Sequence, residues 1–192
     1  IKESSKIFKK ICGKILFSKI KEAEFIKLYS NANRYINFAI ANQLYLMCEE
    51  YNVNFKKVRT LMRYGYERNL NLPGSGFSAG PCLLKDTMQL SSFFKGNFGL
   101  GQAAMQVNQK SMIDLVINRV KKIKNYKKIT IWILGIAFKA ETDDIRDSLS
   151  IFLMKKLKKL KIKYIYNDVY YKDKKSYDQK KLISKSDIII IG

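Results

Sequence analysis

The sequence predicts an α/β protein in which an all-helical domain with a long spine helix is followed by an incomplete Rossmann-like domain with a parallel sheet. Apolar residues recur at steps of three and four from residue 22 to residue 51, and no Pro or Gly interrupts them. The pattern changes at residue 129, where an Ile-rich apolar run follows a basic junction. After that run, strand-like and helix-like segments alternate, as they do in βαβ units.

The helical half is dominated by the spine at residues 22–51. At this length it would measure roughly 45 Å, which is more than a small core needs and indicates a subunit contact. Asn54 can cap a second helix over 55–62. Further helical patterns cover 83–94 and 103–122, whereas residues 1–20 indicate only a short strand or helix.

The C-terminal part follows the order of a Rossmann-type unit. We expect a buried parallel strand at 129–135, a loop at 136–144, a helix at 145–160 and a strand at 162–166 that leads to Asp168. A last strand at 187–191 stops in the middle of a sheet, so this domain is expected to be incomplete.

The composition excludes some classes of protein. No stretch reaches the roughly 18 consecutive apolar residues that a membrane span requires, and no targeting segment is recognisable. The three cysteines are irregularly spaced and the chain has no histidine, which excludes an ordinary zinc site and the usual histidine base. Free thiols fit a reducing cytosol, so we expect a cytoplasmic protein that uses no metal.

The formal charge of +21 suggests nucleic-acid binding, because polyphosphate backbones attract lysine. The lysines, however, are spread over the whole chain. Clusters such as that at 155–159 alternate with leucine, as on a solvated helix face. The sequence therefore favours an ordinary basic surface over nucleic-acid contact.

Cys82 follows a dense cluster of small residues at 73–81 that contains both prolines of the chain. This loop leads into the predicted helix at 83–94, and Lys85 lies close by in the sequence. A helix N-terminus and a lysine both favour the thiolate, which is the nucleophilic form of cysteine. On these features alone, a structural cysteine remains the alternative.

Lys27 and Asn31 are four residues apart in the spine, so their ammonium and amide groups share one face of the helix. Together they could donate two hydrogen bonds to a developing oxyanion. The same spacing is common on ordinary solvated faces, and the pair alone does not decide between the two interpretations.

Three motifs occur in a fixed order along the chain. They are EAEFIKLYSN at 22–31, GSGFSAGPCLLKD at 74–86, and GIAFK at 135–139 followed by TDDIRDS at 142–148. This combination resembles the UDP-glucose and GDP-mannose dehydrogenase family over nearly the whole chain. The resemblance implies NAD-dependent oxidation of the C6 alcohol of a nucleotide sugar, with a UDP sugar as the expected substrate, to the uronic acid.

The resemblance also implies roles for individual residues. Cys82 corresponds to the nucleophile that forms a thiohemiacetal and then a thioester, which retains the reactive aldehyde between two oxidations. Lys27 and Asn31 resemble the pair that stabilises the oxyanion, and Asp86 resembles the carboxylate that helps to activate water. The expected substrate-binding residues are Gly74, Gly76, Phe77, Gly80 and Lys139, and the expected NAD-binding residues are Lys85 and Arg146.

By the same resemblance, residues 1–20 would be the tail of a missing NAD-binding domain, 21–124 the central helical domain for dimerisation and catalysis, and 125–192 part of a nucleotide-sugar-binding domain. A homodimer through the long helix and a role in polysaccharide biosynthesis are expected. Either Arg63 or Arg68 would reach the substrate of a neighbouring subunit. No Gly-x-Gly-x-x-Gly loop opens the chain, so the chain alone is expected to be inactive.

Departures from the family pattern leave the sugar and the nucleotide base open. Ala79 replaces a glycine of the family loop, and Leu84 replaces a proline. Two alternatives to an active enzyme remain, namely a catalytically dead dimerisation module and a basic nucleic-acid-binding protein.

Overall fold

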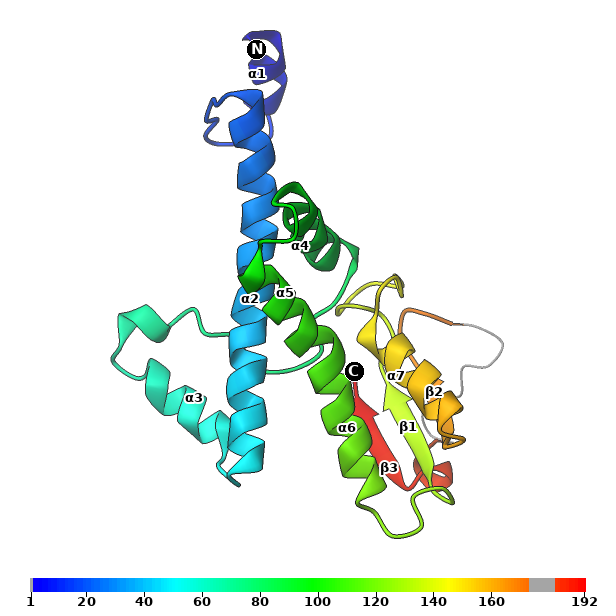
Figure 1. The fold of residues 1–192 in the computed structure, drawn as a ribbon. Coiled ribbons are helices and arrows are strands. Elements are labelled where there is room, and N and C mark those ends of the chain that lie inside the picture. Colours follow the sequence, from blue (N-terminus) through cyan, green and yellow to red (C-terminus); the bar gives the residue numbers. More distant parts are fainter. Residues whose placement is uncertain (1, 173–181) are drawn as a thin grey trace.

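The computed structural model describes residues 2–172 and 182–192 and confirms the predicted α/β class. Helices fill the N-terminal part, and a small parallel sheet follows them (Figure 1). The elements are α1 (Lys2–Phe8), α2 (Ile20–Glu50), α3 (Phe55–Arg63), η1 (Glu67–Asn69), α4 (Pro81–Phe93), α5 (Gly99–Met105), the π-helix η2 (Gln106–Ser111), α6 (Met112–Lys121), β1 (Thr130–Leu134), α7 (Leu149–Lys159), β2 (Lys163–Asn167), η3 (Ile183–Lys185) and β3 (Ile188–Ile191).

The predicted spine is α2, a single helix of 31 residues. Its first turn is closed by the backbone N–H of Lys19, which donates to Glu22 Oε2 at 2.8 Å. Helices α4 and α5 pack on one side of α2, and α3 lies on the other side (Figure 1). The buried stripe of α2 is rich in alanine, including Ala32 and Ala39, and small side chains let the neighbouring helices approach closely.

The predicted helix at 103–122 begins earlier, at Gly99, and is not a regular α-helix throughout. Residues 106–111 form a π-helix between α5 and α6, a local geometry that the helical pattern at 103–122 did not predict. The physical reason lies at Asn108, which is fully buried and bonds to α2. Turns of this kind re-aim single side chains and occur frequently at functional sites.

The C-terminal strands form a parallel sheet in the order β2-β1-β3. Strand β1 is central, and its Ile131 and Ile133 side chains are fully buried against α7 and α6. Trp132 points to the opposite face and packs with Ile165 and Leu182. Since α6 contributes Ile117 to the core of the sheet, one hydrophobic core joins the helical and the sheet parts.

The helix predicted at 145–160 begins only at Leu149, so its first four predicted residues belong to a loop. The backbone explains the delay, because Asp147 has a φ of 52°, which interrupts a right-handed helix. The loop is closed by the backbone N–H of Phe138, which donates to the carbonyl of Asp144 at 3.0 Å. The loop between β1 and α7 is therefore closed by its own hydrogen bond at the carboxyl end of β1.

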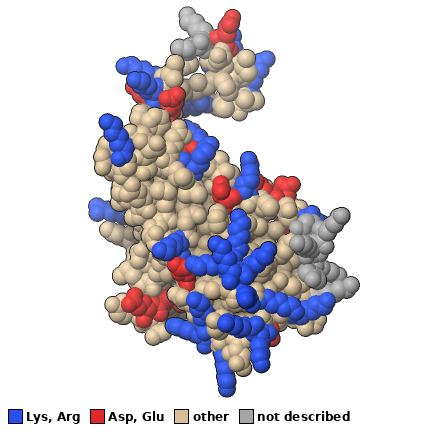
Figure 2. Space-filling view, turned by 45° about the vertical axis from the view of Figure 1, so that its right-hand side comes forward, with Lys and Arg blue, Asp and Glu red and all other residues tan. Residues whose placement is uncertain are grey.

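Basic side chains gather on the face where the C-terminal part comes forward (Figure 2). Several lie along α7, whose last turn contains Lys156, Lys158 and Lys159. Within the described ranges, no helix is both long enough and apolar enough to cross a bilayer.

Candidate active site

The loop at 73–80 delivers Cys82 to the first turn of α4. Gly80 precedes the helix with a φ of 104°, a conformation that glycine adopts at little cost. Pro81 occupies the first helical position, where its missing N–H is not needed. The sulfur of Cys82 is therefore presented at the helix N-terminus, and the residue is exposed.

Gly80 is also the point where the loop touches the C-terminal part. A Cβ atom at this position would lie 2.4 Å from the Phe138 ring. The family motif in 135–139 is thus packed directly against the residue that leads into α4. This contact has no counterpart in the local sequence pattern, and sequence reasoning missed it.

We expect Gly80→Ala to destabilise the protein by about 1–3 kcal/mol, because alanine is strained at this φ and its methyl group meets the Phe138 ring. Thermal unfolding followed by circular dichroism should show a Tm lower by about 2–12 °C, because 1 kcal/mol corresponds to about 2–4 °C in a chain of this size. Gly74→Ala is the matched control, since an added Cβ there has no neighbour within 4 Å among the described atoms. Equal Tm values for the two variants would contradict the role assigned to Gly80.

A buried carboxylate lies one helical turn after the cysteine. Asp86 has no exposed side-chain surface, and its Oδ2 accepts hydrogen bonds from Lys27 Nζ and Asn31 Nδ2, both at 2.5 Å. Within the described chain, Oδ1 has no hydrogen-bond partner, and Lys85 Nζ stands 4.0 Å away from it. Burial alone would raise the pKa of Asp86, but the hydrogen bonds from Lys27 and Asn31 outweigh it and lower the pKa.

Three of the four predicted catalytic residues, Lys27, Asn31 and Asp86, come together in the structure. Lys27 and Asn31 lie on one face of α2, as their spacing indicates, and both turn toward α4. Cys82 and Asp86 are four residues apart in α4 and share a face of that helix. The roles proposed for these four side chains remain predictions.

Arg146 lies in the loop before α7 and pairs with a neighbouring carboxylate. Its guanidinium pairs with Asp144 at 2.7 Å, and this hydrogen bond is the main reason why the pKa of Arg146 is raised. The neighbouring Asp147 lines a shallow hollow together with Lys85 of α4.

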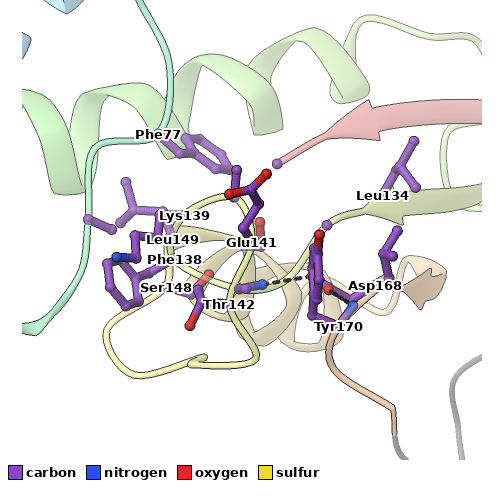
Figure 3. A pocket seen from close by; sticks show the side chains of 17 residues that line it. Phe77, Leu134, Phe138, Lys139, Glu141, Thr142, Ser148, Leu149, Asp168 and Tyr170 are labelled. Atoms are coloured by element: carbon purple, nitrogen blue, oxygen red, sulfur yellow. Dashed lines mark hydrogen bonds between the residues drawn. The ribbon is translucent and has the colours of Figure 1, made fainter.

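A cavity of about 530 Å³ opens at the carboxyl ends of the strands (Figure 3). In a parallel sheet whose first strand is central, ligands bind at this edge, where the chain order reverses. Phe77 reaches the cavity from the loop before α4, and Lys139 and Glu141 reach it from the loop after β1 (Figure 3). The cavity is therefore shared by the two parts of the chain.

Asp168 lines this cavity and accepts hydrogen bonds from the loops after β1 and β2. Its Oδ2 accepts the backbone N–H groups of Ile136 and Ala137 at 2.8 and 3.0 Å, and its Oδ1 accepts those of Tyr170 and Tyr171 at 2.9 and 3.2 Å. Burial acts to raise the pKa of Asp168, but these four donors lower it overall. The one sequence signal for this role was an acidic residue directly after a predicted strand.

Other predicted residues lie away from the cavity. Gly74 is exposed and does not line it, and Gly76 is held by hydrogen bonds to Asn42 instead. Arg63 Nε donates to the carbonyl of Leu70, and neither Arg63 nor Arg68 lines the cavity. The choice between these two arginines stays a prediction.

Comparison with known families decides the assignment. The profile described as "UDP-glucose/GDP-mannose dehydrogenase family, central domain" matches residues 21–110, and the profile for the UDP binding domain of the same family matches residues 132–191. The chain belongs to the UDP-glucose/GDP-mannose dehydrogenase family. The resemblance drawn from the sequence motifs is thereby confirmed.

Individual relatives of this nucleotide-sugar dehydrogenase family agree. A UDP-N-acetyl-D-mannosamine dehydrogenase of Pyrococcus horikoshii is 34% identical over 141 residues, which cover 71% of this chain and 33% of the relative. The UDP-glucose 6-dehydrogenase YwqF of Bacillus subtilis is 27% identical over 146 residues, or 72% of this chain and 32% of the relative. This chain thus spans about a third of the length of the relatives it matches.

The fold agrees with a solved structure as well. The UDP-D-ManNAc dehydrogenase structure from Pyrococcus horikoshii superposes with a TM-score of 0.80 at 26% identity, covering 93% of this chain and 43% of that one. The similarity extends over the helical part, the sheet and their junction. The arrangement of Cys82, Asp86 and the cavity is therefore carried by a fold that occurs in this family.

Proposed function

We propose that this chain is the central and nucleotide-sugar-binding part of an NAD-dependent dehydrogenase that oxidises the C6 alcohol of a UDP sugar to the carboxylate. The observation that carries the proposal is the cluster at α4. There Asp86 lies one helical turn after Cys82 and is hydrogen-bonded to Lys27 and Asn31. A thiol, a carboxylate and two hydrogen-bond donors are the groups that covalent aldehyde oxidation requires. The name of the second matched profile, a UDP binding domain, supports uridine as the base.

Cys82 would act between two oxidations. The first oxidation converts the C6 alcohol to an aldehyde and releases the hydroxyl proton. The Cys82 thiolate adds to C6, and the carbonyl oxygen becomes an oxyanion that is protonated to give a thiohemiacetal. Loss of a second hydride from C6, together with the proton of the thiohemiacetal hydroxyl, gives a thioester. Water then adds to this carbon, the carbon–sulfur bond breaks, and the thiolate returns to Cys82 as the acid leaves.

Lys27 and Asn31 each have N–H groups left for the oxyanion after bonding to Asp86. An ammonium has three N–H groups and an amide has two, and each residue gives one hydrogen bond to Asp86. The carboxylate therefore holds both groups in place, and their remaining N–H groups, which make no other hydrogen bond among the described residues, could bind an oxygen at C6. Asp86 Oδ1, which has no hydrogen-bond partner in the described structure, is the atom that could accept a proton from the attacking water.

NAD, when bound, supplies the acceptor for each of the two hydrides. The residues that fit its pyrophosphate are Lys85 and Arg146, because both are exposed cations, one in α4 and one in the loop before α7. Their side chains are 67% and 74% exposed, so an anion can approach them without burying an unpaired charge.

The nucleotide of the substrate would bind in the cavity at the sheet edge. Asp168 already occupies the N–H groups of Ile136 and Ala137, which in a Rossmann unit often receive phosphate. Substrate phosphates must then bind other donors, and Lys139 is the one Lys or Arg among the described residues that line the cavity. Phe77 offers an apolar face beside it (Figure 3).

The domain division at 21–124 and 125–192 and a homodimer through α2 are part of the same proposal, as are a cytoplasmic location and a role in polysaccharide biosynthesis. Support for the dimer comes from the apolar side chains that α2 leaves exposed, among them Phe25, Ile26 and Tyr29. Support for the division comes from the separate matches at 21–110 and 132–191.

Titration calorimetry with UDP-glucose and UDP-N-acetylmannosamine tests the binding part of the proposal. We expect the chain to bind at least one of them, and Lys139→Ala to weaken this binding about tenfold, the loss of one charge-assisted hydrogen bond. Lys122→Ala is the control, since Lys122 is an exposed lysine that follows α6 and does not line the cavity. If neither UDP sugar binds while duplex DNA binds with a steep dependence on salt, the nucleic-acid alternative is correct.

A further inference from the structure

The loop before Cys82 is bonded to the spine by one buried side chain. Asn42 of α2 accepts the N–H of Gly76 at its Oδ1, at 2.8 Å, and donates from Nδ2 to the carbonyl of Gly76 at 3.0 Å. Both polar groups of one peptide residue are thus held by a single amide. Asn42 itself has no exposed surface, and Gly76 is partly buried.

A second asparagine braces the first. Asn42 Nδ2 also donates to Asn108 Oδ1 at 2.9 Å, and Asn108 Nδ2 donates to the backbone carbonyl of Tyr35 at 3.0 Å. Asn108 is fully buried and lies in the π-helix η2. The adjacent Gln109 Nε2 donates to the hydroxyl of Tyr35 at 3.2 Å. The π-helix is therefore bonded to both the backbone carbonyl and the hydroxyl of Tyr35 in α2.

Both N–H donors of Asn42 and its oxygen take part in hydrogen bonds. Its two N–H donors serve the Gly76 carbonyl and Asn108, and its oxygen serves the Gly76 N–H. A residue without an acceptor and two donors would leave the partly buried Gly76 groups or the buried Asn108 side chain unpaired. Asparagine at position 42 is therefore required for this set of hydrogen bonds.

We infer that Asn42 and Asn108 are positioning residues that fix the loop at 76–80, and through it Phe77 and Cys82; their effect on catalysis rests on the proposed function. Phe77 adjoins Gly76 and lines the cavity, and Cys82 follows at the end of the same loop. The loop is held at Gly76 by Asn42 and at Gly80 by the Phe138 ring. With both ends fixed, the cavity wall and the sulfur keep a constant separation.

Hydrogen exchange of the ligand-free chain, resolved by NMR, tests the positioning role directly. In the wild type, the Gly76 amide should exchange at least about tenfold more slowly than the amide of the exposed Gly74. Asn42→Leu should remove this difference, and Asn108→Leu should reduce it, because Asn42 then loses its brace. Asn33→Leu, at an exposed position of the same helix, should leave it unchanged.

The location of the effect separates positioning from general destabilisation. Faster exchange confined to 74–80, with unchanged exchange in the middle of α2, supports positioning. Faster exchange throughout α2 and α4, or equal rates for Gly74 and Gly76 in the wild type, would overturn it. If Asn42→Leu does not fold, Asn108→Leu and the wild-type comparison still decide.

The affinity for a ligand then tests whether the hydrogen bonds of Asn42 and Asn108 matter for the proposed function. If a UDP sugar binds the wild type, Asn42→Leu or Asn108→Leu should weaken it about tenfold, and the Asn33→Leu control should not. Unchanged affinity in both Asn42→Leu and Asn108→Leu would show that binding does not require these hydrogen bonds to the loop. Failure of the wild type to bind any UDP sugar would refute the proposed function while the exchange result for Gly76 stands.

Discussion

Replacement of Cys82 by serine in a full-length form that contains this chain is expected to lower the overall two-step oxidation by about three orders of magnitude or more. A serine hydroxyl is a far weaker nucleophile than a thiolate, so the aldehyde would no longer be captured at this position. Substrate binding should persist, because Cys82 does not line the cavity where Phe77 and Lys139 lie. Steady-state production of NADH and titration of the UDP sugar measure the two effects separately.

Cys12→Ser is the matched control for this experiment. Cys12 is exposed like Cys82, but it lies between α1 and α2, outside the described site residues. It should keep the activity of the wild type. Normal product formation by Cys82→Ser, or an equal loss in Cys12→Ser, would contradict a covalent role for Cys82.

Asp86→Asn is expected to have the second largest effect, a fall in turnover of about 100-fold or more, which is the usual contribution of a general base. Asparagine keeps the shape of the side chain but removes the charge that holds Lys27 and the oxygen that could accept a proton from water. The protein should still fold, since the Lys27 side chain is 56% exposed and can be hydrated when its partner is lost. Turnover and far-ultraviolet circular dichroism distinguish the two effects.

The same substitution predicts a change in acid stability. The pKa of Asp86 is lowered in the folded protein, so its contribution to stability is present above the unfolded pKa of about 4 and is lost as pH falls through the folded pKa. Asp168 titrates in the same direction and adds to the loss. Urea unfolding between pH 7 and pH 3 should therefore show a smaller decline in stability for Asp86→Asn than for the wild type. Parallel curves would refute this.

Local patterns in the sequence predicted the elements and part of the site. The three- and four-residue period between residues 22 and 51 predicted α2, and the Ile-rich run predicted the central strand β1. The four-residue spacing of Lys27 and Asn31 placed them on one face, and the loop chemistry placed Cys82 at a helix start. These features depend on neighbours within one or two turns of chain, which is why periodicity could reveal them.

Contacts between distant segments could not be predicted in this way. Asn42 and Asn108 are 66 positions apart, and the Phe138 ring meets Gly80 across the junction of the two parts. One signal was present for Asn42, because it continues the buried stripe that includes Tyr35 and Ala39, where a polar side chain is unusual. The π-helix gave no such signal, since its irregular turn depends on the hydrogen bonds that Asn108 makes to α2.

Covalent attachment of the sugar to one sulfur is the feature on which the proposed function most depends. Rapid quenching of the full-length form during turnover, followed by proteolysis and mass spectrometry, detects such an adduct and locates it. We expect the mass of the nucleotide sugar on the peptide that carries Cys82, and no such mass in Cys82→Ser. An adduct on a peptide carrying Cys12 or Cys48, or full turnover without any adduct, would contradict the assignment of Cys82 as the nucleophile.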